Sequence, residues 1–169
     1  MIGQVLVVLG LSVLIPGAIA LGLIVSDPPG RRAAGPGGLD FDGQLSGGAP
    51  ALPVEEARLR DGSSTLVRHL RGPEGGPLVV LVHGSGWDGG QFDALAPGLS
   101  AMADVLAPDL RGHGAAPVRR GDVDYAGQME DDLADLIAAY RRDENQKVVL
   151  LGHSSGGGLV IRFANGAHG

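Results

Sequence analysis

The stretch Val148-Val149-Leu150-Leu151-Gly152-His153-Ser154-Ser155-Gly156-Gly157-Gly158 decides how the rest of this chain is interpreted. Its apolar run is typical of a strand buried on both faces of a sheet, and it ends abruptly at a serine bracketed by glycines. The apolar segment 159–164 that follows the glycines is expected to form a helix. Gly152-x-Ser154-x-Gly156 therefore has the strand-turn-helix setting that gives the G-x-S-x-G pattern its chemical meaning.

A turn of this kind predicts that Ser154 is a nucleophile. The turn must be tight enough to hold the serine in a strained conformation with its hydroxyl outward, and side chains two positions away on either side would collide. Ser155 does not fit the pattern, because His153 stands where its first glycine would be needed. A glycine-rich phosphate loop or an ordinary strand-to-helix turn remains the alternative, since the motif is short and the chain is rich in glycine.

Composition limits the chemistry that is open to the chain. It has 169 residues, 30 of them glycine, and no cysteine, which excludes disulfides, cysteine metal sites and a cysteine nucleophile. The five histidines lack any metal-ligand spacing, so neither a metal nor a cofactor is expected. The formal charge of −6 argues against a nucleic-acid partner, which favours a basic surface.

The amino-terminal segment predicts a membrane anchor. Ile2–Val25 is a nearly continuous apolar block with no charged side chain, long enough as a helix to cross a bilayer core of roughly 30 Å. We therefore expect a transmembrane helix over residues 1–25 and a single-pass membrane location. A cleaved signal peptide, which would lead to secretion, is the alternative, because Ala18-Ile19-Ala20 follows a Pro-Gly break. Arg31 and Arg32 follow the apolar segment, and positive charges beside a membrane helix favour the cytoplasmic side. They weakly favour a cytoplasmic location for the folded part of the chain.

Two further regions follow this segment. Residues 26–53 are rich in Pro, Gly, Ala and Ser without an apolar period, which predicts a linker. The folded body is expected over residues 54–169. It begins with alternating segments, 54–59 and 64–70, around a turn at Asp61-Gly62, a pattern that predicts an antiparallel hairpin at an edge of the sheet.

Apolar runs and helical periods alternate after the hairpin. The run Leu78–Val82 resembles the one before Ser154, and Val105–Ala107 predicts a short strand between them. Helical spacing is present over 91–101, with Phe92 on its apolar side, and again over 129–140. Strands that alternate with helices predict an α/β fold with a mostly parallel sheet, helices on both faces and ligand sites beyond the carboxyl ends of the strands.

Two more glycine-containing loops follow strands at the same rim as Ser154. They are His83-Gly84-Ser85-Gly86-Trp87 and Pro108-Asp109-Leu110-Arg111-Gly112-His113-Gly114. Acyl transfer needs backbone N–H groups that face the developing negative charge, one of them following the nucleophile. The amides of Ser85 and Ser155 are the candidates, with Gly86 as a substitute for Ser85.

In this order of motifs the chain resembles the α/β-hydrolase fold family, and within it the branch similar to lysophospholipases, monoacylglycerol lipases and serine aminopeptidases. The resemblance covers roughly residues 54–169. It implies that Ser154 attacks the carbonyl of a small-molecule ester, lipid or lysophospholipid-like, and less often of an amide. It also implies that Ser85 and Ser155 supply oxyanion amides and that Asp109 and Arg111 order neighbouring turns.

The chain departs from the family pattern after the nucleophile. The family's acidic residue and histidine follow the serine in that order, yet residues 155–169 contain no carboxylate side chain, and His168 is the one histidine there. His83, His113 and His153 are interpreted as making local turn hydrogen bonds. We therefore expect an amino-terminal half of a hydrolase, inactive or nearly so by itself, with Val148–Leu151 left as an open sheet edge.

The sequence also offers two alternative functions. A non-catalytic, membrane-tethered binding or scaffold domain would keep the fold without the full set of catalytic residues. A nucleotide-binding domain that uses the glycines after Gly152 is disfavoured, because the G-x-x-x-x-G-K-[ST] pattern is absent. The sequence leaves the oligomeric state and the individual substrate open.

Overall fold

The chain divides into two units, residues 1–39 and 40–169. The computed structural model describes residues 2–26, 49–115, 117 and 119–166, so most of the expected linker lies outside the described residues. In the first unit α1 is a single helix, Ile2–Ser26, with Pro16 inside it. No helix among the residues described has the combination of length and hydropathy that crossing a membrane requires, and the transmembrane segment expected over residues 1–25 is therefore not supported.

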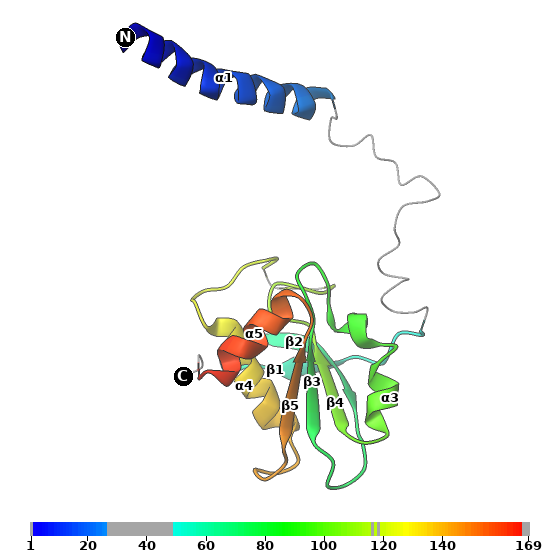
Figure 1. Cartoon of the computed structure of the whole chain (residues 1–169). Coiled ribbons are helices and arrows are strands. Elements are labelled where there is room, and N and C mark those ends of the chain that lie inside the picture. The colour runs from blue at the N-terminus through cyan, green and yellow to red at the C-terminus, as the bar shows by residue number, and fades with distance from the viewer. Residues whose placement is uncertain (1, 27–48, 116, 118, 167–169) are drawn as a thin grey trace. The chain divides into compact units, whose positions relative to one another are not determined.

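The second unit is built around a sheet with the strand order β1-β2-β4-β3-β5 (Figure 1). Strand β3 runs parallel to β4 and to β5, whereas β2 is antiparallel to both β1 and β4. The bounds of the strands are β1 Glu55–Arg58, β2 Ser64–Leu70, β3 Leu78–Val82, β4 Asp104–Pro108 and β5 Val148–Gly152.

The sheet is mixed, which corrects the expectation of a mostly parallel one. The loop between β1 and β2 is too short for a crossover connection, so these strands can pair only as an antiparallel hairpin. This hairpin was expected from the alternating sequence. The structure adds that β2 continues the sheet by pairing antiparallel with β4, with Val67 opposite Pro108.

Helices cover both faces of the sheet, as expected. On one face the core contains Leu78, Val80 and Val82 of β3 together with side chains of α4 and α5. On the other face Val79 and Leu81 pack with the short helices η1 and α3. Successive residues of β3 therefore enter opposite cores, and all five are buried. The helix bounds are η1 Gly89–Phe92, α3 Ala96–Ser100, α4 Gln128–Tyr140 and α5 Ser155–Ala164.

The helix predicted over residues 91–101 is interrupted. Helix η1 ends at Phe92 and α3 begins at Ala96, with Pro97 in its first turn. Proline has no backbone N–H to donate and is favoured in the first turn of a helix, where that N–H has no partner within the helix, so Pro97 fits the start of a second helix. Met102, which continues the helical spacing of apolar residues in the sequence, lies beyond α3 and is 65% exposed.

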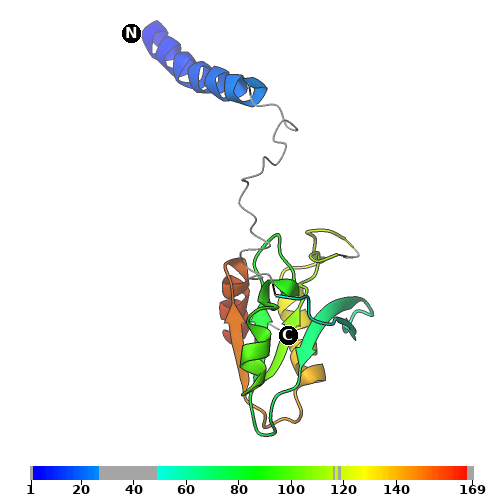
Figure 2. The same ribbon diagram turned by 90° about the vertical axis from the view of Figure 1, so that its right-hand side faces the viewer.

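Strand β5 lies at an edge of the sheet and is not buried on both faces. Along the part of the chain that the structure describes, it pairs only with β3 (Figures 1 and 2). Val148 and Leu150 pack against the first core, whereas Val149 and Leu151 are 48% and 40% exposed. The open apolar edge was expected, but the double-sided burial suggested by the unbroken apolar run is wrong for this strand.

Candidate active site

Ser154 occupies a sharp turn between β5, which ends at Gly152, and α5, which begins at Ser155. Its backbone has φ 53° and ψ −121°, and it is the one non-glycine residue with positive φ in the described part of the chain. Such a conformation costs on the order of 1–3 kcal/mol and persists only where the surroundings impose it. The side chain is exposed and makes no capping hydrogen bond to α5, so its hydroxyl is accessible at the tip of the turn.

Backbone contacts require glycine on both sides of Ser154. A Cβ atom on Gly152 would lie 2.4 Å from the carbonyl oxygen of Gly156. A Cβ atom on Gly156 would lie 2.4 Å from the carbonyl oxygens of both Val82 and His83. The second contact shows that the start of α5 packs directly on the end of β3. The two glycines therefore allow the turn at Ser154 to close against the neighbouring strand.

The turn after β3 lies next to Ser154. The backbone N–H of His153 donates to the carbonyl oxygen of Val82 at 2.9 Å, and a Cβ atom on Gly84 would lie 3.2 Å from the Ser154 Cβ. Ser85 and Ser155 also meet here. The amide and the hydroxyl of Ser85 both donate to the Ser155 hydroxyl oxygen, at 2.8 and 2.9 Å.

The Ser85–Ser155 contact modifies the expected oxyanion site. The sequence predicts that the Ser85 N–H is free to donate to a substrate oxygen. In the structure this N–H already donates to the Ser155 hydroxyl oxygen. A carbonyl oxygen that approaches the amide must first displace this hydroxyl. The sequence contained no signal for this contact, because residues 85 and 155 are far apart in the chain.

His83 orients the peptide that carries the Ser85 amide. Its ring is fully buried; Nδ1 donates to the Gly84 carbonyl oxygen at 2.8 Å, and Nε2 accepts from the Leu110 amide at 2.9 Å. These partners require a neutral ring, and burial lowers the pKa of His83. In a trans peptide the carbonyl and the next N–H point in opposite directions. Holding the Gly84 oxygen therefore fixes the direction of the Ser85 N–H.

The third loop, after β4, has the structural role that was expected. The Asp109 carboxylate is buried and accepts from the Gly89 amide at 2.9 Å and from Arg68 Nη1 at 3.0 Å. Arg111 binds Asp132 through two hydrogen bonds of 2.8 Å. His113 Nδ1 donates to the Arg111 carbonyl at 2.9 Å, which is the local turn bond predicted for it.

Comparison with known proteins identifies the family. The model of a family described as serine aminopeptidase S33 (Hydrolase_4) matches residues 74–169. This range is more than half of the chain and contains the turns at residues 83–87, 108–114 and 152–156. The chain belongs to this family. The resemblance to α/β hydrolases inferred from the sequence is thereby confirmed.

Individual relatives agree with the assignment but are much longer. The magnesium-chelatase 30 kDa subunit of Rhodobacter capsulatus is 34% identical over 93 residues, which are 55% of this chain and 32% of the relative. Protein phosphatase methylesterase 1 of Bos taurus is 29% identical over 112 residues, or 65% and 29%. The crystal structure of an α/β hydrolase from Novosphingobium aromaticivorans matches with a TM-score of 0.55 at 28% identity, covering 68% of this chain and 40% of that one. The chain thus spans about a third of these curated relatives.

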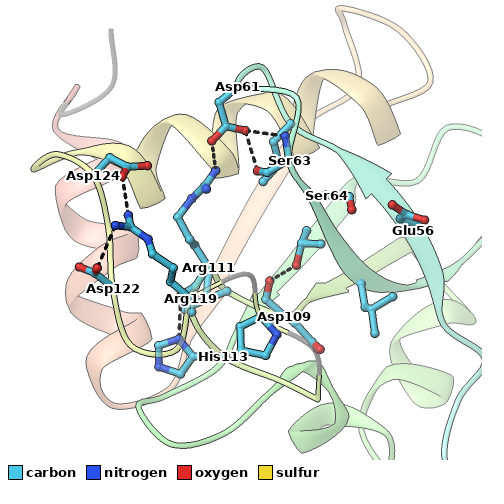
Figure 3. Close-up of a pocket in the computed structure, with 16 residues that line it drawn as sticks. Glu56, Asp61, Ser63, Ser64, Asp109, Arg111, His113, Arg119, Asp122 and Asp124 are labelled. Carbon is cyan, nitrogen blue, oxygen red and sulfur yellow. Dashed lines mark hydrogen bonds and ion pairs between the residues drawn. The ribbon is translucent and has the colours of Figure 1, made fainter.

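A cavity in this hydrolase-family chain lies away from Ser154. It has a volume of about 400 Å³ and is lined by the β1–β2 hairpin and by residues 109–113, 117, 119, 122 and 124 (Figure 3). Its cationic side chains are already paired. Arg111 lies 2.9 Å from Asp61, and Arg119 pairs with both Asp122 and Asp124. The cavity is therefore held together by internal ion pairs, and we assign it no part in the chemistry at Ser154.

The residues that follow the nucleophile in the structure offer no acid or base. Between Ser155 and Gly166, all of which are described, there is neither a carboxylate side chain nor a histidine. His168 lies outside the described residues.

Gln91, which the periodicity placed only as the first residue of a helix, is instead buried between the turns at residues 84 and 153.

Proposed function

We propose that this chain contributes the nucleophile and oxyanion site of a serine hydrolase that cleaves carboxylic esters. The observation that carries the proposal is the backbone of Ser154, which is held at positive φ by glycine contacts on both sides while its side chain stays exposed. Backbone strain at one accessible serine is typical of a nucleophile elbow. The hydroxyl and amide groups of Ser85 and Ser155 lie beside this serine.

The chemistry would proceed through an acyl-enzyme. The Ser154 oxygen attacks the ester carbonyl carbon, its proton passes to a base, and the carbonyl oxygen becomes an oxyanion near the amides of Ser155 and Ser85. The alcohol then leaves with a proton, and water releases the acid from Ser154. Loss of one oxyanion donor typically costs about 10²–10³ in rate, so the orientation of the Ser85 peptide is part of this proposal.

The substrate class is part of this proposal, and the name of one relative supports it. One relative is named as a methylesterase, which favours ester rather than amide hydrolysis. We propose a small-molecule ester, lipid or lysophospholipid-like. A serine without a base is a poor nucleophile, and the described residues 155–166 supply none. We therefore propose that ester turnover depends on a base from outside this described segment. The cellular location expected from the sequence stays a prediction.

Covalent labelling tests the proposal. In the full-length natural protein, a fluorophosphonate probe should add to Ser154, as shown by peptide mass spectrometry, and Ser154→Ala should abolish the adduct. Ser100→Ala is the matched control, because Ser100 only donates to the Pro97 carbonyl within α3 and its loss should leave labelling unchanged. A folded protein that is not labelled would favour the non-catalytic binding or scaffold domain instead. Labelling at another serine would refute Ser154 as the nucleophile.

A further inference from the structure

We propose that Gln91 is a positioning residue that holds the turn of Ser85 and the turn of Ser154 at a fixed separation. The catalytic effect of Gln91 rests on the proposed function. The contacts that Gln91 makes are independent of that function. Gln91 belongs to η1 and is only 8% exposed. Its role does not follow from any motif, because its partners lie in two loops that are distant from each other in the sequence.

One side-chain amide contacts both turns. The Oε1 atom of Gln91 accepts from the Gly84 backbone N–H at 3.3 Å. Its Nε2 atom lies 2.7 Å from His153 Nδ1, and because an amide nitrogen can only donate, the ring nitrogen must be the acceptor. His153 is the residue directly before Ser154, and Gly84 is the residue directly before Ser85. Each proposed catalytic group is therefore adjacent to a residue that Gln91 holds.

The contact to Gly84 completes the fixation of that residue. Its carbonyl oxygen accepts from His83 Nδ1 at 2.8 Å and from the Trp87 amide at 3.3 Å. Its N–H is bound by Gln91. Gln91 thus holds the His83–Gly84 peptide, while His83 and Trp87 hold the carbonyl of the Gly84–Ser85 peptide. With the peptides on both sides of Gly84 held, the Ser85 N–H keeps its direction. Such pre-orientation is what an oxyanion site requires.

Gln91 is itself mounted on a well-anchored segment. The Asp109 carboxylate accepts from the Gly89 amide at 2.9 Å, and the Asp88 carboxylate accepts from the Gly90 amide at 2.7 Å. Arg68 ties these acids together and also lies 3.1 Å from Asp93. A positioning side chain acts only if its own backbone is fixed. Here two carboxylates that pair with Arg68 accept from the backbone N–H groups of the two residues that precede Gln91.

The chemistry of the side chain suggests why glutamine stands here. Glutamine is both a donor and an acceptor, so it can serve a backbone N–H and an unprotonated ring nitrogen together. Gln91→Glu keeps an acceptor for Gly84 but cannot donate to a neutral His153. Gln91→Met has a similar length and loses both bonds. A glutamate could contact His153 only as an acceptor from a protonated Nδ1. The two variants therefore separate the His153 contact from the Gly84 contact when the His153 tautomer is measured in each.

The matched control is Gln146, a second bridging glutamine elsewhere in the fold. Its Nε2 atom donates to the Gly76 carbonyl at 3.0 Å and to Asp104 Oδ2 at 2.9 Å. It precedes β5, whereas Ser154 follows that strand. Its Oε1 atom also accepts from the Arg142 amide at 2.8 Å. Gln146→Met therefore removes three hydrogen bonds without touching either turn of the site.

Ester hydrolysis and probe labelling in the full-length protein test the catalytic consequence. We expect Gln91→Met to lower kcat and the labelling rate at Ser154 by roughly tenfold or more, because small misplacements of reacting groups have large effects on rate. KM should change much less, and Gln91→Glu should fall between Gln91→Met and the parent protein. Gln146→Met should lower the melting temperature by a similar amount with kcat unchanged. Equal kcat in Gln91→Met and Gln146→Met would overturn the positioning role.

The tautomer of His153 tests the contact independently of catalysis. Nitrogen-15 NMR of the imidazole at neutral pH should show an unprotonated Nδ1 and a protonated Nε2 in the parent protein. This preference should be lost in Gln91→Met and kept in Gln146→Met. A protonated Nδ1 in the parent would overturn the inference even if Ser154 proves to be the nucleophile. The expected tautomer without Ser154 labelling would instead refute only the proposed hydrolase function.

Discussion

Ser154 stores backbone strain at the scale of a single residue. A Cβ atom is poorly accommodated at φ 53° and ψ −121°, and glycine has no such penalty. We therefore predict that Ser154→Gly is more stable than Ser154→Ala by about 1 kcal/mol, after allowing for the greater freedom of glycine in the unfolded chain. Urea unfolding of the two variants measures the difference, and both lack the hydroxyl, so the comparison isolates the backbone.

The same pair of substitutions at Ser100 provides the control. Ser100 is the last residue of α3, and in a helical conformation glycine is the less stable of the two residues. The order of stability should thus be reversed between the two sites. An alanine variant that is the more stable at both positions would contradict the interpretation that Ser154 is strained.

At the scale of elements, the close approach of α5 to the end of β3 is what closes the turn. It depends on Gly156, where a Cβ atom would meet backbone oxygens of β3 and the following residue at 2.4 Å. Backbone atoms cannot rotate away, so Gly156→Ala should lower the free energy of unfolding by roughly 1–3 kcal/mol, the usual cost of overpacking. It should also weaken labelling of Ser154, because the turn must open.

Gly158 is the matched glycine within the same helix. A Cβ atom there would meet nothing within 4 Å, so Gly158→Ala should raise the free energy of unfolding by about 0.5–1 kcal/mol through helix propensity. Chemical denaturation of the two variants gives both values. Destabilisation of similar size at Gly156 and Gly158 would show that the contact with β3 is unimportant.

At the scale of the whole molecule, Asp104 joins segments that are far apart in the chain. Its fully buried carboxylate accepts two hydrogen bonds of 2.7 Å from Arg142, one of 2.9 Å from Gln146 and one of 2.7 Å from the Gly72 amide. We predict that Asp104→Asn lowers the free energy of unfolding by about 2 kcal/mol at pH 7, since the neutral amide loses the charge-assisted hydrogen bonds from the partly exposed Arg142. Urea unfolding measures the loss, and Glu144→Gln on the surface is the control.

Low pH should remove the stabilisation that the Asp104 carboxylate provides. The hydrogen bonds from Arg142 hold the pKa of Asp104 well below its ordinary value of 3.8. The stabilisation is therefore fully present above that value and is lost as the pH falls below it, because the unfolded chain binds the proton more readily. Between pH 5 and pH 3 the parent protein should lose more stability than Asp104→Asn. Parallel losses in the two proteins would refute this assignment.

The sequence by itself determined the features that depend on local pattern. The hairpin, the strands at 78–82 and 148–152, the helices over 128–140 and behind Ser154, and the glycines around that serine were all predicted, because each follows from periodicity or from steric needs within a few residues. The pattern also predicted that Ser85, Ser154 and Ser155 would lie at one rim, since carboxyl ends of parallel strands share an edge.

Only the tertiary structure decided the contacts between distant segments. The pairing of β2 with β4, the exposure of Val149 and Leu151, the Ser155 hydroxyl on the Ser85 amide, and Gln91 between Gly84 and His153 each join residues that no local spacing relates. The physical reason is that a hydrogen bond or a buried face depends on three-dimensional distance, and distance across a sheet is set by strand order, which the apolar pattern of a strand does not record.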